Sequence, residues 1–181
     1  MAEKLEEVDM EPKLCKEERF NMPRRGAPPA KVITPDPVYG NTLVTKLVNR
    51  AMMDGKKTVS QKQIYHAFDI IKEKTKEDPM VIFGQALDNI RPSMEVRSRR
   101  VGGAAYQVPM PVRGVRKDSL AIRWLIEFSR KRSNSEFHTF ALKLAAEILD
   151  AAKEEGASVK KRQDMERSAE ANRAFSHFKW N

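Results

Sequence analysis

The chain has 181 residues, the size of one domain, and is long enough to bury roughly two thirds of its unfolded surface. It carries 34 Lys and Arg against 25 Asp and Glu, and residues 91–132 alone hold eleven basic and three acidic residues. Charge concentrated in this way attracts polyanions; nucleic acid is the commonest such partner, and an anionic membrane surface is the alternative. No stretch approaches the roughly 18–20 consecutive apolar residues of a membrane-spanning helix.

The first 35 residues are predicted to form an extended tail. Residues 1–21 are an acidic extension, and residues 22–35 form a basic arm whose prolines disfavour a helix or an interior strand, so the tail orders, if at all, on a partner. The single cysteine, Cys15, has no internal disulfide partner, which suits a reducing compartment. The N-terminus lacks the apolar core of a signal peptide and is too acidic for a transit peptide, so we expect a cytoplasmic protein.

Three amphipathic helices are predicted after the tail. From Asn41, apolar residues recur on one helix face over about 13 residues, and Asp54-Gly55 supplies the stop. A second helix is expected over about residues 60–74. A third opens at Asp78-Pro79, a capping residue followed by proline at the first helical position, and ends before Arg91.

The next segment has the pattern of a two-stranded β-ribbon. Met94–Val101 and Ala105–Val112 have the length of strands, and Gly102-Gly103 between them tolerates the positive φ angles of a tight turn. Pro109 and Pro111 lack the amide proton for a ladder hydrogen bond, so their strand is expected to be an edge or a protruding arm. A ribbon of two strands is marginal alone, so its stability should come from whatever it contacts.

Helical patterns return after the ribbon. Apolar residues from Ala121 to Phe128 predict a fourth helix that ends at residues 130–132, and those from Phe137 to Ala152 predict a fifth, closed by Gly156. The last segment, residues 158–181, has only a thin apolar stripe and is therefore expected to lie on a partner.

The predicted fold is mainly α, a bundle of about six helices with a protruding two-stranded antiparallel β-ribbon between the third and fourth helices. Its predicted parts are the tail (1–35), a helical domain (36–157) that carries the ribbon at 94–112, and a C-terminal helix and tail (158–181).

No catalytic or metal-binding pattern is present in the sequence. His66, His138 and His177 are far apart, and clustered Cys and His at the spacing of metal ligands are missing. Val101-Gly102-Gly103 lacks the spacing and the following helix of a phosphate loop. We expect structural or surface roles for the histidines, no enzymatic activity, no cofactor and no metal.

The basic side chains of the ribbon favour nucleic acid. Alternation places Arg97 and Arg99 on one face and Arg100 on the other, and a guanidinium group both pairs with phosphate and stacks on bases. Tyr106 adds a stacking surface, although cross-strand packing is equally compatible. Composition leaves DNA open, as in a helical DNA-binding regulator with a helix-turn-helix at Asp54-Gly55, but mixed elements with Arg, Lys and an aromatic ring suit folded RNA.

Four motifs in one order along the chain resemble the family of bacterial small-subunit ribosomal protein seven. They are DGKK (54–57), RPSMEVRSRRVGGAAYQVPMPVR (91–113), SLAIRW (119–124) and AEANRAFSHFKW (169–180). The resemblance covers about residues 22–180. It implies a helical bundle with a protruding ribbon on the cytoplasmic ribosome, binding to the 3′ major domain of small-subunit ribosomal RNA, and nucleation of head assembly. It also implies a position beside the exit-site tRNA and the mRNA path, and contact with neighbouring ribosomal proteins including number eleven. Some members of the family also repress their own operon.

The resemblance further implies which residues bind. The basic arm, the Asp-Gly-Lys-Lys turn, the ribbon and the last helix are expected to face RNA. The expected RNA-binding residues are Arg24, Arg25, Lys31, Lys56, Lys57, Arg91, Arg97, Arg99, Arg100, Arg113, Arg116, Lys117, Lys160, Lys161 and Arg162. Those expected near tRNA or mRNA are Gly102, Gly103, Tyr106, Arg173 and Lys179. The basic run 160–162 opens a helix, where the helix dipole disfavours cations, so it needs a compensating anion such as phosphate.

The sequence departs from the family pattern at three places. Family members often begin at Met-Pro-Arg-Arg, here Met22–Arg25, so residues 1–21 are an added acidic extension or reflect an upstream start. Pro111 stands where an acidic or polar residue is more usual, which leaves the pairing at the base of the ribbon open. The connection at 133–138 is longer than usual and has no expected role.

Overall fold

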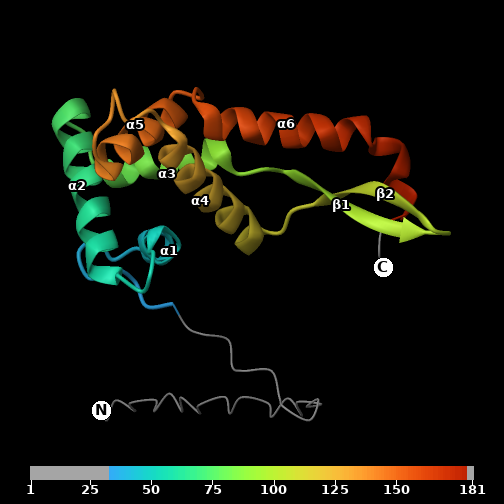
Figure 1. Cartoon of the computed structure of the whole chain (residues 1–181), viewed down its shortest axis with the longest axis horizontal. Helices are drawn as coiled ribbons and strands as arrows, with labels where there is room; N and C mark the ends of the chain where they lie inside the picture. The colour runs from blue at the N-terminus through green and yellow to red at the C-terminus, as the bar shows by residue number, and fades with distance from the viewer. Residues whose placement is uncertain (1–32, 179–181) are drawn as a thin grey trace, which may run out of the picture. The chain divides into compact units, whose positions relative to one another are not determined.

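Helices and one hairpin make up the computed structural model, which describes residues 33–178 (Figure 1). Along the chain they are α1 (Thr42–Ala51), α2 (Lys57–Thr75), α3 (Pro79–Ile90), β1 (Met94–Val101), β2 (Ala104–Pro111), α4 (Gly114–Lys131), α5 (Phe140–Ala152), α6 (Ala157–Ala171) and the 3-10 helix η1 (Arg173–Phe178). The predicted fold class is confirmed, because this part of the chain is mainly α with a two-stranded antiparallel sheet between α3 and α4.

Several predicted features lie outside the described residues. These are the acidic extension and Cys15, the arm residues Arg24, Arg25 and Lys31, and Lys179 near the other end. Within residues 33–178, no helix combines the length and the apolar character needed to span a bilayer.

Side-chain caps determine where three of the helices begin. Asn41 before α1 and Asp78 before α3 each accept a hydrogen bond from the backbone N–H two residues on, at 2.8 and 3.0 Å. The hydroxyl of Thr139 accepts one from the N–H three residues on at 3.3 Å, so α5 begins at Phe140 rather than at Phe137. Such caps satisfy amide groups that have no partner inside the helix, which is why they mark helix starts.

The end of α1 and the start of α2 differ from the prediction. α1 stops at Ala51, before Asp54-Gly55, and α2 begins at Lys57 rather than near residue 60. Donors on other helices complete the last turn of α1, because Ser60 and Arg130 bond to its carbonyls at 3.1 and 2.8 Å. Asp54-Gly55 forms the connecting turn itself, with positive φ at both residues. The spacing of apolar residues along the chain does not reveal hydrogen-bond donors from distant helices, so it could not predict where α1 ends.

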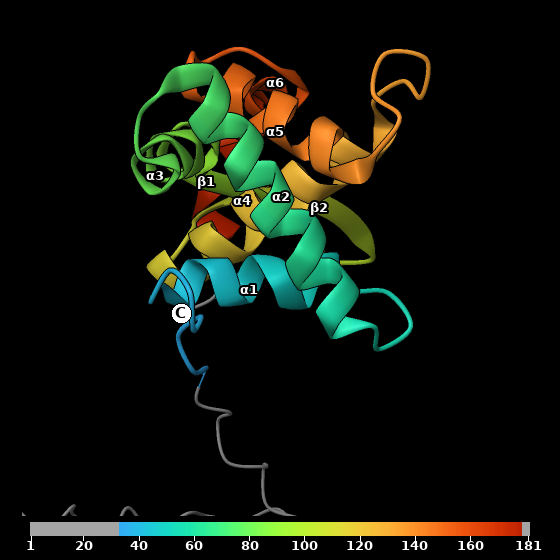
Figure 2. The same ribbon diagram turned by 90° about the vertical axis from the view of Figure 1, so that its left-hand side faces the viewer.

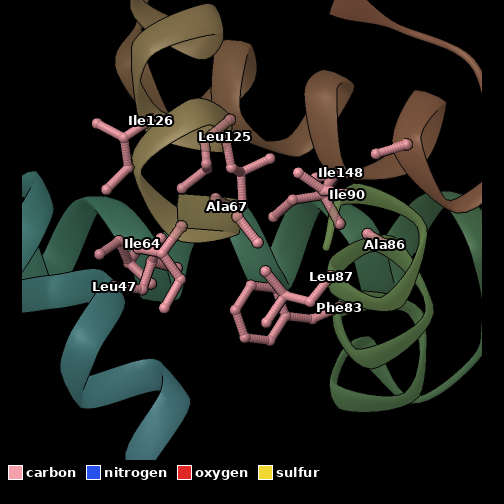
Figure 3. Close-up of a cluster of buried hydrophobic side chains, with 14 of the residues drawn as sticks. Leu47, Ile64, Ala67, Phe83, Ala86, Leu87, Ile90, Leu125, Ile126 and Ile148 are labelled. Atoms are coloured by element: carbon pink, nitrogen blue, oxygen red, sulfur yellow. The ribbon is translucent and has the colours of Figure 1, made fainter. Parts of the chain in front are cut away.

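The core lies between four helices, with α5 packed against α2, α3 and α4. α1 contacts α2 and α4 and runs crosswise to α2 (Figure 2). Figure 3 shows the apolar side chains that meet there from the predicted inner faces, among them Leu47, Ile64, Phe83, Leu87, Leu125 and Ile148. All six are at most 1% exposed, and burying a side chain of this size contributes about 1.5–3 kcal/mol. The core is the main source of stability for the surfaces described below.

The segment before α1 is tied to the helices by Asp36. Its side chain is 4% exposed, and its carboxylate accepts hydrogen bonds from the Tyr65 hydroxyl at 2.9 Å and from the N–H of Val38 at 3.2 Å. The Thr45 hydroxyl donates to the carbonyl of Thr34 at 2.9 Å. These bonds anchor residues 34–38 on α1 and α2.

The hairpin of β1 and β2 accommodates both prolines without losing its ladder. Pro109 faces Val96 and Pro111 faces Met94. Beyond Pro111 the register continues, because the N–H of Val112 donates to the carbonyl of Ser93 at 3.0 Å. Hydrogen-bonded and non-hydrogen-bonded pairs alternate in an antiparallel sheet, so both prolines occupy non-hydrogen-bonded positions, where no ladder amide is needed. This answers the question that the sequence left open at Pro111.

The hairpin packs on the C-terminal segment of the same chain. Figure 1 shows α6 running beside it, and contacts join α6 to β1 and η1 to β2. Ser93 at the base of the hairpin donates from its N–H and its hydroxyl to Glu166 of α6, at 3.0 and 2.7 Å. The ring of Tyr106 lies 5.3 Å from that of Phe175 and 5.2 Å from that of Phe178. The polar C-terminal helix therefore supplies the contact that a two-stranded ribbon needs.

Candidate nucleic-acid interface

A buried carboxylate orients two of the predicted RNA-binding arginines. The Glu95 side chain is 6% exposed and accepts hydrogen bonds from Arg97 at 2.5 Å and from Arg116 at 2.7 Å. The two arginine side chains remain 46% and 50% exposed. One negative charge thus holds two guanidinium groups at the junction of β1 and α4. The cluster keeps a net positive charge, and both arginine side chains remain accessible to solvent.

The other predicted ribbon residues have different environments. Arg100 is exposed, whereas Arg99 is half-buried, faces Tyr106 across the strands and donates to the carbonyl of Phe178. The ring of Tyr106 packs on the aromatic residues of η1, an arrangement that neither base stacking nor packing inside the ribbon predicted. Gly102-Gly103 at the tip has the expected positive φ at both residues and is exposed.

Arg91 is engaged inside the protein. Its guanidinium group forms ion pairs with Asp118 at 2.9 Å and with Asp88, and Lys46 also reaches Asp118 at 3.5 Å. Two carboxylates therefore balance its charge, and it connects the end of α3 to α4. Its geometry is that of a structural ion pair more than of a phosphate ligand.

A buried carboxylate caps the start of α6. Glu147 of α5 is 1% exposed and accepts hydrogen bonds from the N–H and the hydroxyl of Ser158, at 3.0 and 2.5 Å. Its carboxylate lies at the positive end of the helix dipole. Lys160 and Lys161 are exposed, whereas Arg162 is half-buried.

The structure also brings together basic residues that the sequence analysis missed, in what we term the α1–α4 groove. Two hollows, of about 360 and 450 Å³, lie between these helices and share Arg50. The first is lined by Ile33, Lys46, Asn49, Arg50, Val115, Ser119 and Ile122, and the second by Arg50, Arg123, Ile126, Glu127, Arg130 and Lys131. Glu127 bonds to Lys131 at 2.6 Å, and this hydrogen bond holds the pKa of the carboxyl below its usual value.

A sequence signal for part of this groove exists. Arg116, Arg123 and Arg130 are seven residues apart, so they share one face of α4 at steps of about 10 Å. All three are exposed. Arg50 of α1, which lines the groove together with Arg123 and Arg130, has no such signal, because only the packing of α1 on α4 brings it near these two residues.

The remaining predicted residues border the same side chains or are exposed. Lys56 is exposed and lines a cavity that Arg130 also lines, and Lys57 is the exposed first residue of α2. Arg113 precedes α4 and is exposed, Lys117 is half-buried, and Arg173 is the exposed first residue of η1.

The histidines are not brought together. His66, His138 and His177 are exposed on separate elements. Among residues 33–178, no group of three or more His, Cys, Asp or Glu side chains is arranged to hold a metal ion.

Comparison with known proteins finds relatives over most of the chain. The sequence profile of the family described as ribosomal protein S7p/S5e matches residues 23–173. The chain belongs to this family. Within the S7p/S5e family, "Small ribosomal subunit protein uS7" of Carboxydothermus hydrogenoformans is 53% identical over 159 residues, which is 88% of this chain and 100% of the relative. The uS7 proteins of Caldanaerobacter subterraneus subsp. tengcongensis and Rubrobacter xylanophilus are 55% and 52% identical over the same shares of both chains.

Membership of the S7p/S5e family confirms the resemblance drawn from the four motifs. As a family member, the chain is a structural component of the small ribosomal subunit and not an enzyme. The alternative of a helical DNA-binding regulator has no support from these relatives.

Proposed function

We propose that this S7p/S5e protein binds the 3′ major domain of small-subunit ribosomal RNA directly and nucleates assembly of the head. The observation that carries the proposal is the line of exposed arginines on α4. It begins at Arg130 and Arg123 beside Arg50, and it reaches the hairpin through Arg116 and Arg97, which share the carboxylate of Glu95. Guanidinium groups in such a row neutralise successive phosphates and release their counterions.

The arrangement suits folded RNA because its basic groups lie on different kinds of element. The α1–α4 groove offers charge along a helix pair, whereas the hairpin offers Arg100 on an extended arm. Irregular RNA is recognised through its shape and its phosphates by surfaces of this kind. A protein that contacts several RNA segments at once orders them relative to one another, which is what nucleation of a domain requires.

We also propose that the protein lies beside the exit-site tRNA and the mRNA path. The residues proposed to lie near tRNA or mRNA are Gly102, Gly103, Tyr106, Arg173 and Lys179. Its support is the family membership and the exposed tip of the hairpin. Neighbouring small-subunit proteins, number eleven among them, are the proposed protein partners. Lys160, Lys161 and Arg162 on α6 and Arg113 and Lys117 on α4 are proposed to add phosphate contacts.

The test is the salt dependence of binding to a transcript of the 3′ major domain. With about six phosphates contacted, log affinity against log salt should fall with a slope of roughly −5. The variant Arg116→Ala/Arg123→Ala/Arg130→Ala should flatten the slope by about 2–3. The matched control Lys62→Ala/Lys72→Ala/Lys74→Ala removes three exposed charges from α2 and should leave the slope unchanged. Equal slopes for both triple variants, or equal affinity for duplex DNA of the same length, would contradict the proposal.

A further inference from the structure

A cavity of about 410 Å³ lies between the turn that joins α1 to α2 and the loop that precedes α5. We term it the Gln63 cavity. Its size is that of pockets that hold small ligands. Met53, Val59 and Phe140 form its apolar walls, and Lys56, Arg130 and His138 stand among its polar groups. No carboxylate from residues 33–178 lines it, so the cavity is suited to an apolar group that belongs to an anion.

Gln63 of α2 gives the cavity a specific chemistry. Its side chain lines the cavity, and its Oε1 atom is buried without a hydrogen-bond partner among the described residues. Buried acceptors in folded proteins are almost always satisfied, so an unpaired one indicates a missing donor. A ligand with an N–H group would supply that donor.

The loop that the sequence left without a role builds one wall of the cavity. Asn134 and His138 come from it. Lys143 of α5 is 8% exposed and holds the loop through hydrogen bonds to the carbonyl of Arg132 at 2.6 Å and to Asn134 Oδ1 at 2.5 Å. The wall is therefore held in place by side chains of the folded bundle.

The Gln63 cavity and the α1–α4 groove are neighbours, because Arg130 lines both. Its guanidinium group is anchored on the carbonyl of Ala51 at 2.8 Å and lies 6.0 Å from the centre of the Phe140 ring. A polynucleotide that follows the groove would pass the opening of the cavity with a phosphate close to Arg130 and Lys56.

We propose that the Gln63 cavity receives one unstacked adenine of the bound ribosomal RNA. Gln63 Oε1 is enclosed in the free protein, so its side chain would turn toward the cavity to accept a hydrogen bond from adenine N6 and donate one to N7, the paired contact by which Gln distinguishes adenine. Met53, Val59 and Phe140 enclose the base, as apolar and aromatic groups do when proteins bind unpaired nucleotides. Lys56 and Arg130 bind the flanking phosphates. This inference rests on the proposed binding of ribosomal RNA.

The first experiment compares Gln63→Leu with Gln61→Leu in the full chain, using the 3′ major domain transcript as the probe. Leu has a similar size and removes the unpaired acceptor, so the melting temperature should be maintained or rise. Affinity for the transcript should fall about tenfold for Gln63→Leu, and one adenine should lose its protection from chemical modification. Gln61 is on the same helix but does not line the cavity, so its variant should match the wild type.

A second variant keeps the test decisive if Gln63→Leu fails to fold. Val59 is 53% exposed, so Val59→Trp fills the cavity from its surface without disturbing the core. It should expose the same adenine. Replacing that adenine by purine riboside, which lacks the 6-amino group, should weaken wild-type binding and have no further effect on Gln63→Leu.

The outcomes separate this inference from the function on which it rests. If the wild-type chain does not bind the transcript, both fail. If the wild type binds but Gln63→Leu and Val59→Trp bind equally well with every adenine protected, the adenine pocket is overturned and RNA binding stands. If the losses of affinity caused by Gln63→Leu and by purine riboside were additive, the adenine pocket would also be overturned.

Discussion

The carboxylate of Glu147 and the hydroxyl of Ser158 are hydrogen bonded at 2.5 Å, and this contact joins the end of one bundle helix to the start of the helix that supports the hairpin. Arg132 completes the site with a bond to the same carboxylate at 2.8 Å. Gly156 lies directly against it, because a Cβ atom there would be 3.3 Å from Glu147 Oε1. One buried charge and one glycine therefore contribute to the placement of α6 relative to α5, together with the packing of α6 on α3 and α4.

Glu147→Ala should destabilise the protein by about 3 kcal/mol, because Arg132, whose side chain is 19% exposed, loses a buried partner. Gly156→Ala should cost about 1–3 kcal/mol, since φ is +93° and the new methyl group crowds the carboxylate. Chemical denaturation measures both. Glu155→Ala, at an exposed neighbouring position, is the control and should be neutral. A neutral Glu147→Ala would show that the joint is not fixed by this charge.

The contact between Tyr65 and Asp36 predicts a loss of stability at alkaline pH. Burial and the hydrogen bond to Asp36 raise the pKa of Tyr65 to about 12, against about 10 in the unfolded chain. The folded state therefore holds a proton that the unfolded state releases. This contribution is complete below pH of about 10 and is lost as the pH rises toward 12. Tyr65→Phe should be less stable at neutral pH by about 1–2 kcal/mol and should lose this step in its melting temperature.

The contact between Glu166 and Ser93 predicts a loss of stability in acid. Burial raises the pKa of Glu166, but hydrogen bonds from the N–H and hydroxyl of Ser93 and the charge of Arg162 outweigh it, so the pKa is lowered. A lowered folded pKa contributes stability that is present above the unfolded value near 4.3 and disappears as the pH falls through the folded value. The protection of the hairpin amides from hydrogen exchange should therefore decrease as the pH falls through the folded pKa of Glu166.

Glu166→Ala should remove that acid dependence and raise exchange rates in β1 at neutral pH. Glu170→Ala, one helical turn further on and exposed, should preserve both. Equal exchange in the two variants would mean that the hairpin is held by its aromatic contacts alone.

The hairpin arginines should separate binding from folding. Arg100 is exposed, so Arg100→Ala should reduce affinity for the RNA transcript several-fold and change stability by less than about 0.5 kcal/mol. Arg97 pairs with buried Glu95, so Arg97→Ala should lower both affinity and stability, the latter by about 1–3 kcal/mol. Parallel titrations and thermal melts measure the two effects. A large loss of stability in Arg100→Ala would indicate a structural role instead.

Local chemistry allowed much of the fold to be predicted. The cap and proline at Asp78-Pro79 and the turn at Gly102-Gly103 act through neighbouring residues, so the sequence reveals them directly. The end of α1 was misplaced because Arg130, far along the chain, bonds to its last carbonyl.

In the candidate interface, too, residues that are neighbours in the sequence could be predicted, whereas contacts between distant segments could not. The arginines of the hairpin could be named from sequence because they are clustered there. Arg50 could not, since its neighbours in the α1–α4 groove come from a distant helix. The packing of Tyr106 on Phe175 and Phe178 was also hidden, because it depends on how α6 returns along the hairpin.

The positions of Pro109 and Pro111 have a consequence for the protein before it meets RNA. In a non-hydrogen-bonded pair the backbone amide points away from the partner strand, so at these two positions the outer edge of β2 presents carbonyl groups but no N–H donor. Another strand that approached this edge would find two of its acceptors without partners. Pro109 and Pro111 therefore disfavour the pairing of another strand with the outer edge of β2, and so disfavour aggregation of the unbound protein through this edge.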